Sequence, residues 1–409
     1  MNDGQELHHH PEVPALNFER LKVISALGRG AKGVVFLVKD EERDQFLALK
    51  VISKALIEKK NKTVKNDGNE YRRVCFEQEV LNRFQHPLFP KLRGVLDTEK
   101  FVGYAMDYCP GRDLHSLRKR QTEKMFSDDI IRFYAAELVL ALEYLHSLGI
   151  VYRDLKPDNI MIRENGHIMI VDFDLSTKLS PKTPPSSRTP NSVASPSPNS
   201  VIKKKRFSPF LRLCNSGISP YDSIHASERS DNSPLTTDSV SSEKSNSFVG
   251  TEEYVAPEIV AGNGHDFAVD WWSLGVVLYE MLYATTPFRG SNRKETFYRI
   301  LSKPPELTGE TTPLRDLIRK LLEKDPKQRI NVDEIKGHDF FRGIDWDYVA
   351  QITRPPYIPE NVDEGRDGIS NIDVESVVQG IFGSEEDDSN HVGNVNTKKD
   401  GETDKFHIF

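Results

Sequence analysis

The chain has 409 residues, of which 37% are hydrophobic and 29% are charged, a composition typical of a water-soluble protein that buries a large core. Its net charge of −7 argues against a general nucleic-acid-binding protein. The cysteines show no disulfide framework or zinc spacing, and no apolar run approaches the roughly 20 residues of a membrane-spanning helix, so we expect an intracellular protein without a transmembrane segment.

The first part of the chain is predicted to form a meandering antiparallel sheet. Residues 1–17 are expected to be flexible, and β-rich runs then begin at Phe18, in LKVISAL, GVVFLVK and FLALKVI. Charged residues 56–69 indicate a loop, EYRRVCFEQEVLNRF shows helical spacing, and FVGYAMDY indicates a further strand. Residues 18–106 therefore predict a small unit made of one sheet and one main helix.

Residues 107–341 predict a larger, mainly helical unit. Ser127 is placed to cap a helix that carries IIRFYAAELVLALEYLHSLG to its C-terminal glycine, and VDWWSLGVVLYEML and LRDLIRKLLEKD predict later helices. Residues 179–246 interrupt this pattern with Ser, Thr and Pro, which are too polar to bury a core, so we expect a disordered loop insertion. Residues 342–409 form a tail that is acidic from about residue 360, and we expect this acidic part to be flexible until its last residues.

A glycine-rich segment, LGRGAKGVVF, lies between the first two predicted strands. Glycine lets the backbone approach phosphate groups closely and point its N–H groups at them. An ordinary glycine-rich hairpin would look the same, whereas a dinucleotide-binding loop is disfavoured because a strand follows the last glycine. We predict that nucleotide phosphates contact this segment, which consists of Leu27, Gly28, Arg29, Gly30, Ala31, Lys32, Gly33, Val34 and Val35.

Lys50 ends the third predicted strand, at a spacing that could bring its ammonium group over the same loop. Glu77 is the candidate partner because it lies four residues before Leu81, on the same face of the predicted helix. Glu79 is the rival candidate and is expected to be solvated. An ion pair between Lys50 and Glu77 would hold the lysine toward α- and β-phosphates.

YRDLKPDN, residues 152–159, carries the strongest chemical signal in the chain. Asp154 can accept the proton of an attacking hydroxyl, and Lys156 can neutralise a phosphoryl group in transfer. Asn159, together with Asp172 at the end of HIMIVDF, offers oxygen ligands for magnesium. A polar turn after a helix is the alternative, but the glycine loop and Lys50 precede this segment in the order that phosphoryl transfer requires.

Three further acidic residues are given structural roles. Glu258 of GTEEYVAPE is predicted to pair with Arg329 of DPKQRI, and Asp270 to anchor the backbone of the catalytic loop. Asp174 stands in IVDFDLS where related turns carry glycine. Because aspartate visits left-handed conformations more readily than most residues, we expect Asp174 to adopt the turn without becoming a third metal ligand.

This ordered set resembles the eukaryotic protein kinases from Phe18 to about Phe341. YRD, GTEEYVAPE, HDFFRGIDW, RPPYIPE and a terminal FxxF are similar to the AGC group of Ser/Thr kinases, and DFD with a long insertion is similar to the plant oxidative-signal-inducible kinases. The resemblance implies an α+β bilobal protein-kinase fold, with a small antiparallel β-sheet lobe carrying one main helix and a larger, mainly α-helical lobe. It also implies ATP and Mg²⁺ as cofactors, with Met106 at the back wall of the ATP cleft.

The resemblance also implies a mode of control. Ser247 lies three residues before Gly250, at the position phosphorylated in AGC activation segments, and its phosphate could pair with Arg153 and Arg73. The alternative is that Ser247 is one more serine in a serine-rich insertion. Phe406 and Phe409 of the closing DKFHIF are expected to dock an upstream phosphoinositide-dependent kinase.

Lys156 and GTEEY favour Ser or Thr acceptors over Tyr. Four residues occupy positions that the resemblance assigns to substrate recognition, namely Asp113, Asp158, Thr251 and Glu280. The three carboxylates among them imply substrates with basic residues before the acceptor.

An active Ser/Thr kinase in a signalling relay is thus the main interpretation. An ATP-binding pseudokinase scaffold is the alternative, supported only by Asp174, and a metabolite kinase fits poorly because GTEEYVAPE shapes a peptide groove. We expect a cytoplasmic monomer, and the basic run at 201–207 leaves a nuclear or membrane-peripheral address open.

Overall fold

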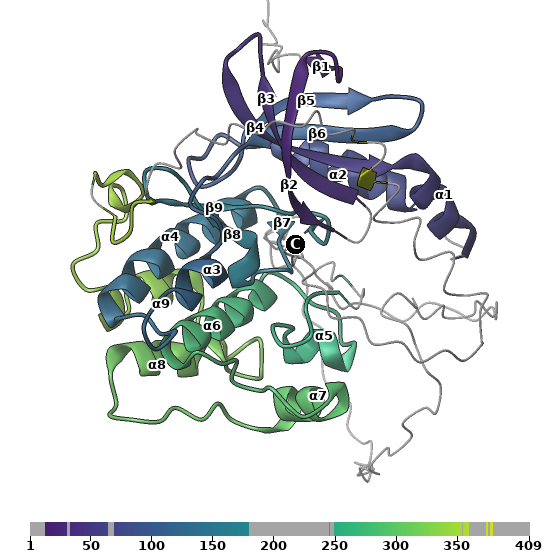
Figure 1. The fold of residues 1–409 in the computed structure, drawn as a ribbon. Helices are drawn as coiled ribbons and strands as arrows, with labels where there is room; N and C mark the ends of the chain where they lie inside the picture. The colour runs from purple at the N-terminus through teal and green to yellow at the C-terminus, as the bar shows by residue number, and fades with distance from the viewer. Residues whose placement is uncertain are drawn as a thin grey trace, which may run out of the picture. The chain divides into compact units, whose positions relative to one another are not determined.

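The computed structural model describes residues 13–30, 33–63, 69–179, 245, 249–353, 355–359, 374 and 377–378. These residues form a small lobe, built around one sheet with the helix α2 (Asn69–Arg83), and a larger lobe of helices (Figure 1). The predicted α+β bilobal architecture is therefore confirmed. Among the helices of the described residues, none is both long and apolar enough to cross a membrane.

The small lobe contains a six-stranded sheet with the strand order β1-β5-β6-β4-β3-β2. Strands β2 to β6 pair antiparallel, as the alternating sequence predicted, whereas β1 runs parallel to β5. Because side chains alternate along a strand, β4 buries Leu47, Leu49 and Val51 on the outer face and turns Ala48 and Lys50 to the other. The strand bounds are Ala15–Leu16 (β1), Leu21–Arg29 (β2), Gly33–Asp40 (β3), Gln45–Ser53 (β4), Leu92–Asp97 (β5) and Phe101–Asp107 (β6).

Two small-lobe segments differ from the prediction. β1 lies inside residues 1–17, which were expected to be flexible, and Leu16 is buried against the outer face of the sheet. The helix α1 (Lys54–Thr63) occupies much of the predicted loop 56–69. The charged residues of this segment indicated a loop, but Ile57 packs into an apolar cluster with Ile52, Val74 and Val102.

The acidic tail also contacts the small lobe. Val374 and Val378 are buried in the outer apolar cluster of the sheet, and Val377 packs partly buried against it. The expectation that the acidic tail would be flexible until its last residues was wrong at these three positions. Spacings of three and four residues place their side chains on one face of a helical turn, which can bury them together.

The large lobe is built around two long helices, α4 and α6, which contact each other. The helix α6 is buried almost all round, and its sequence is accordingly mainly apolar. Ser127 occupies the N-cap position of α4 but makes no side-chain capping bond, so only its position was predicted correctly. The helices of this lobe are α3 (Leu114–Lys119), α4 (Asp128–Ser147), α5 (Pro257–Ala261), α6 (Ala268–Tyr283), α7 (Arg293–Ser302), α8 (Pro313–Leu321) and α9 (Val332–Lys336).

Short elements complete the large lobe and carry its chemistry. The strands β8 and β9 form a hairpin after the catalytic loop, and β7 pairs with β10. Their bounds are Ile150–Val151 (β7), Ile160–Ile162 (β8), Ile168–Ile170 (β9) and Thr177–Lys178 (β10), and the 3-10 turns are Pro157–Asn159 (η1), Asp339–Phe341 (η2) and Val349–Gln351 (η3).

Structured residues occur near both ends of the segment 179–246, which was predicted to be a disordered insertion. Leu179 is buried, and its N–H donates to the Gly149 carbonyl at 2.8 Å. Ser245 forms an isolated antiparallel bridge with His265. Residues 180–244 and 246–248 lie outside the described residues, as do the following predicted site residues: Ala31, Lys32, Ser247, Phe406 and Phe409.

Candidate active site

The predicted ion pair between strand β4 and helix α2 forms. Lys50 Nζ lies 3.0 Å from both carboxylate oxygens of Glu77 and 3.1 Å from Asp172 Oδ1. Glu77 Oε1 also accepts the N–H of Phe173 at 3.1 Å. The rival Glu79 lies on the exposed side of α2, 4.0 Å from Arg83. The lysine and the helix are thus both connected to the turn that carries Asp172.

Burial and charge oppose each other at this pair. Burial alone would lower the pKa of Lys50, but the carboxylates of Asp172 and Glu77 outweigh it and hold that pKa well above its usual value. Tyr104, which the sequence interpretation missed, is the register partner of Lys50 on β6, and its ring centre lies 5.7 Å from Lys50 Nζ. Its place in FVGYAMDY, two residues before Met106, was the available signal. Lys50 therefore stays a cation although burial disfavours its charge, because two carboxylates face it.

The glycine-rich segment connects the strands β2 and β3. The Gly30 N–H donates to the Gly33 carbonyl at 2.9 Å, and a Cβ added at Gly33 would lie 2.0 Å from the Val51 carbonyl oxygen, so only glycine fits there. Val35 faces the main core cluster, which also contains Met106. Val34, predicted to contact nucleotide, is instead fully buried in the outer cluster, because successive residues of β3 point to opposite faces.

The catalytic loop brings three of its predicted residues into one network. Asp154 Oδ2 lies 3.0 Å from Lys156 Nζ and 2.9 Å from Asn159 Nδ2. Thr251 bridges this network from the other end of the activation segment: its Oγ1 donates to Asp154 Oδ1 at 2.9 Å and accepts from Lys156 Nζ at 3.1 Å. Thr251 was predicted as a substrate-recognition residue, and in this structure it fixes the two reacting side chains.

Asn159 and Asp172 fit a divalent cation. Asn159 Nδ2 donates to the Asp154 backbone carbonyl and carboxylate, both at 2.9 Å, which leaves Asn159 Oδ1 buried and without a partner among the described residues. A buried oxygen without a partner is costly, and a hard cation such as Mg²⁺ would satisfy it. Asp172 adopts a left-handed backbone with φ +60°. The same conformation was expected at Asp174, which does not adopt it, because the metal-binding aspartate itself makes the turn.

Asp270 anchors the catalytic loop as predicted. Its carboxylate accepts the backbone N–H groups of Tyr152 at 2.9 Å and Arg153 at 2.8 Å, and it is fully buried. Glu258 and Arg329 form the predicted buried pair, with nitrogen–oxygen distances of 2.7 and 3.0 Å. Both predictions are confirmed.

Arg153 connects the catalytic loop to two segments of the activation region. Its Nε donates to the Leu175 carbonyl at 2.7 Å, and its Nη1 lies 3.0 Å from Ser245 Oγ and 3.3 Å from His265 Nε2. Burial, only partly opposed by nearby negative charge and reinforced by the positive charge of Arg73, lowers the pKa of Arg153 to about 10. Two arginines thus share one region, and nothing in the sequence pattern indicated that Ser245 or His265 would join them.

The predicted substrate carboxylates differ in availability. Asp113 caps α3 and accepts the N–H and the hydroxyl of Ser116 at 2.6 and 2.9 Å. Glu280 is buried, pairs with Arg118 at 2.8 Å and accepts the hydroxyl of Tyr254. Asp158 is partly exposed and makes no hydrogen bond or ion pair within the described part of the chain.

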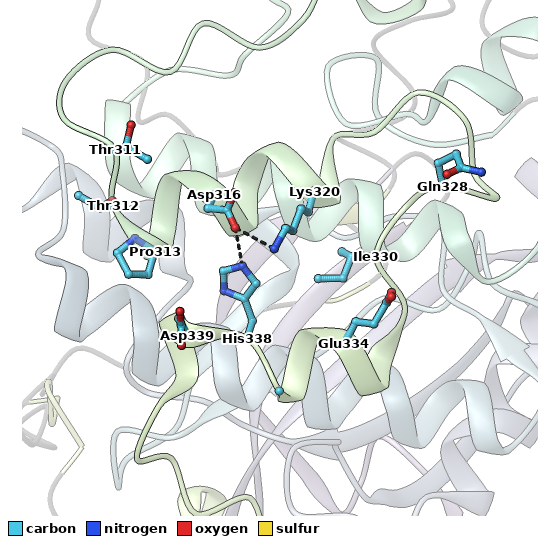
Figure 2. Close-up of a pocket in the computed structure, with 11 residues that line it drawn as sticks. Thr311, Thr312, Pro313, Asp316, Lys320, Gln328, Ile330, Glu334, His338 and Asp339 are labelled. Atoms are coloured by element: carbon cyan, nitrogen blue, oxygen red, sulfur yellow. Dashed lines mark hydrogen bonds and ion pairs between the residues drawn. The ribbon is translucent and has the colours of Figure 1, made fainter.

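A separate pocket lies in the large lobe, away from this network (Figure 2). It is bounded by α8, by α9 and by the turn η2. Asp316 Oδ2 lies 2.9 Å from His338 Nε2 and 2.8 Å from Lys320 Nζ, and the hydrogen bond from Lys320 leads the interactions that lower the pKa of Asp316. No predicted site residue lines this pocket.

Comparisons with known proteins agree with this geometry. A protein kinase domain matches residues 21–206 and 235–341. The chain is 65% identical to the serine/threonine-protein kinase OXI1 of Arabidopsis thaliana, over 93% of this chain and 90% of that protein. It is 42% identical to the kinase UCN (84% and 85%) and 39% identical to AGC1-5 (86% and 62%), both from Arabidopsis thaliana. The chain therefore belongs to the protein kinase family, as a serine/threonine kinase of the AGC group.

Proposed function

We propose that this kinase transfers the γ-phosphoryl group of ATP to Ser or Thr hydroxyls in protein segments that carry basic residues. The observation that supports the proposal most strongly is the gathering of Lys50, Asp154, Asn159 and Asp172 from three separate segments of the chain. Lys50 contacts Asp172, Asn159 contacts Asp154, and the charge of Asp172 acts on Asp154. Phosphoryl transfer needs little covalent help from a protein and depends mainly on positioned charge.

In the proposed reaction each of these side chains acts on ATP or on the acceptor hydroxyl, or holds a residue that does. Lys50 holds the α- and β-phosphates, with its orientation fixed by Glu77. Asp154 orients the acceptor hydroxyl and receives its proton, and Lys156 neutralises charge on the group in transfer. Thr251, in the activation segment, holds these two side chains in place by hydrogen bonds to both.

Asn159 and Asp172 would hold Mg²⁺. When bound, this ion neutralises charge shared between the β- and γ-phosphates. The chain's own contribution is to keep Asn159 Oδ1 free of other partners, because its amide nitrogen is committed to Asp154.

We further propose that phosphorylation of Ser247 activates the kinase and that an upstream phosphoinositide-dependent kinase docks on Phe406 and Phe409. The proximity of the charges of Arg73 and Arg153 supports a phosphate site at this end of the activation segment. Arg153 also contacts the Leu175 carbonyl, three residues after Asp172, so a phosphate there would act on the metal-binding turn. We also propose a cytoplasmic monomer, and the basic run at 201–207 leaves a nuclear or membrane-peripheral address open.

Phosphate transfer to matched peptides tests the proposed specificity. Serine peptides with arginine before the acceptor should be phosphorylated faster than counterparts with glutamate at the same positions. Equal rates, or faster transfer to the acidic peptides, would refute the basic preference.

Docking is tested with the upstream kinase and a Phe406→Ala, Phe409→Ala double variant. Phosphate on Ser247, followed by mass spectrometry, should be lost in this variant. Phosphorylation of Ser247 at the wild-type rate would rule out the docking role.

A further inference from the structure

The segment Thr251–Tyr254 places one glutamate next to the reacting groups. The Tyr254 N–H donates to the Thr251 carbonyl at 2.9 Å, which folds the four residues into a turn. Thr251 Oγ1 lies 2.9 Å from Oδ1 of Asp154, the residue proposed to receive the acceptor proton. Glu252 follows Thr251 directly, and because neighbouring Cα atoms are about 3.8 Å apart, its backbone lies one residue from this contact with Asp154.

The other side chains of this turn are committed to contacts within the large lobe. Glu253 accepts the Thr286 hydroxyl at 2.5 Å and lies 3.5 Å from Arg289 Nε, and the Tyr254 hydroxyl donates to Glu280. Glu252 is partly exposed and makes no hydrogen bond or ion pair with any residue that the structure describes. Its charge is therefore available to a substrate.

The predicted substrate-recognition carboxylates and Glu252 differ in whether their oxygens already have partners. The Glu280 carboxylate faces the guanidinium of Arg118 at 2.8 Å, and both oxygens of Asp113 are used by Ser116. A carboxylate that is already paired offers little further attraction to a basic side chain. Asp158 and Glu252 differ from both, because their carboxylates make neither a hydrogen bond nor an ion pair with any residue that the structure describes.

We propose that Glu252 is a specificity-determining residue, which selects lysine or arginine within about two residues of the acceptor. An extended peptide advances about 3.3–3.6 Å per residue, so a glutamate side chain beside the acceptor reaches no farther than that along it. This inference deepens the proposed function and rests on its preference for basic substrates. The sequence interpretation did not single out Glu252.

The test uses full-length kinase and serine peptides in which lysine, alanine or glutamate is placed in turn at each of the three positions on either side of the acceptor. In Glu252→Gln, the ratio of kcat/KM between the lysine peptide and its alanine counterpart should fall about threefold to tenfold, at one position within two residues of the acceptor. Glu252→Lys should favour glutamate at that same position, a reversal that a structural role would not produce.

Glu310→Gln is the matched control, since Glu310 is exposed in a loop that supplies no residue of the site described above. Asp158→Asn is measured in parallel and should lose selectivity at a different position. Wild-type ratios at every position in both Glu252 variants would overturn the inference, whereas an effect of Asp158→Asn alone would leave the proposed basic preference standing. If wild-type kinase shows no preference for basic peptides at any position, the proposed specificity fails as well.

Discussion

Asp154 and Asp270 both contact the catalytic loop, yet the structure holds them in different ways. Asp270 accepts two backbone N–H groups and a third hydrogen bond involving His146 Nε2 at 2.8 Å. The carboxylate of Asp154 contacts the side chains of Lys156, Asn159 and Thr251. Backbone donors are fixed by the fold, whereas side chains can rotate to admit a substrate. The scaffold carboxylate is therefore fully committed, and the reacting carboxylate keeps exchangeable partners.

The largest effect is expected from Asp154→Asn, which removes the reacting carboxylate. The rate of phosphate transfer should fall about thousandfold, because the hydroxyl loses its proton acceptor. Burial, opposed by Lys156 and reinforced by Asp172, raises the pKa of Asp154, so its charge costs the folded state free energy instead of stabilising it. The free energy of unfolding should accordingly change by only about 1 kcal/mol or less. Radiolabel transfer and urea unfolding measure the two. Unchanged transfer would contradict the role given to Asp154, whereas no transfer by either protein would favour the pseudokinase alternative.

Asp270→Ala removes the carboxylate that anchors the catalytic loop. Two buried N–H groups, those of Tyr152 and Arg153, would lose their acceptor, which should lower the free energy of unfolding by about 2–5 kcal/mol. Asp270→Asn keeps one acceptor and should cost less. Urea unfolding compares the three proteins. A smaller loss in Asp270→Ala than in Asp154→Asn would contradict the contrast between the two carboxylates.

The dependence of the rate on pH sharpens the same contrast. The rate of phosphate transfer should fall with decreasing pH as Asp154 becomes protonated. Because the pKa of Asp154 is raised, this fall should begin at a higher pH than for an ordinary aspartate. Lys156 opposes that increase, so Lys156→Met should move the acid limb of kcat/KM upward by about one pH unit. Lys54→Met, which removes an exposed lysine paired with Asp97, is the control. A limb that stays in place or moves downward would contradict the role given to Lys156.

The smallest expected effect concerns the tail. Val378→Ala removes a buried contact on the outer face of the small-lobe sheet and should lower the free energy of unfolding by about 1–2 kcal/mol. Val377→Ala, at a partly buried position, should cost less. Thermal or urea unfolding of the two variants checks the order, and equal stabilities would show that the buried contact of Val378 adds nothing to the fold.

Much of the site could be read from the sequence because its residues lie in short segments with fixed geometry. YRDLKPDN carries Asp154, Lys156 and Asn159 within six positions, and the helical spacing selected Glu77 over Glu79. Asp270 and the Glu258–Arg329 pair were also predicted, although their partners lie 118 and 71 residues away along the chain. These residues were identified by the motifs in which they stand, not by local spacing.

What remained was decided by contacts between distant segments. The contacts of Ser245 with Arg153, of Thr251 with Asp154, and of Val378 with the sheet join residues that are far apart in the chain, and no local period encodes them. The left-handed conformation occurs at Asp172 rather than at Asp174, and the next residue, Phe173, donates its N–H to Glu77 of a distant helix. Sequence thus determined which residues carry the chemistry, because residue type and spacing set what each can do. Tertiary structure decided which of their charges are neutralised, because that depends on partners brought together only by the fold.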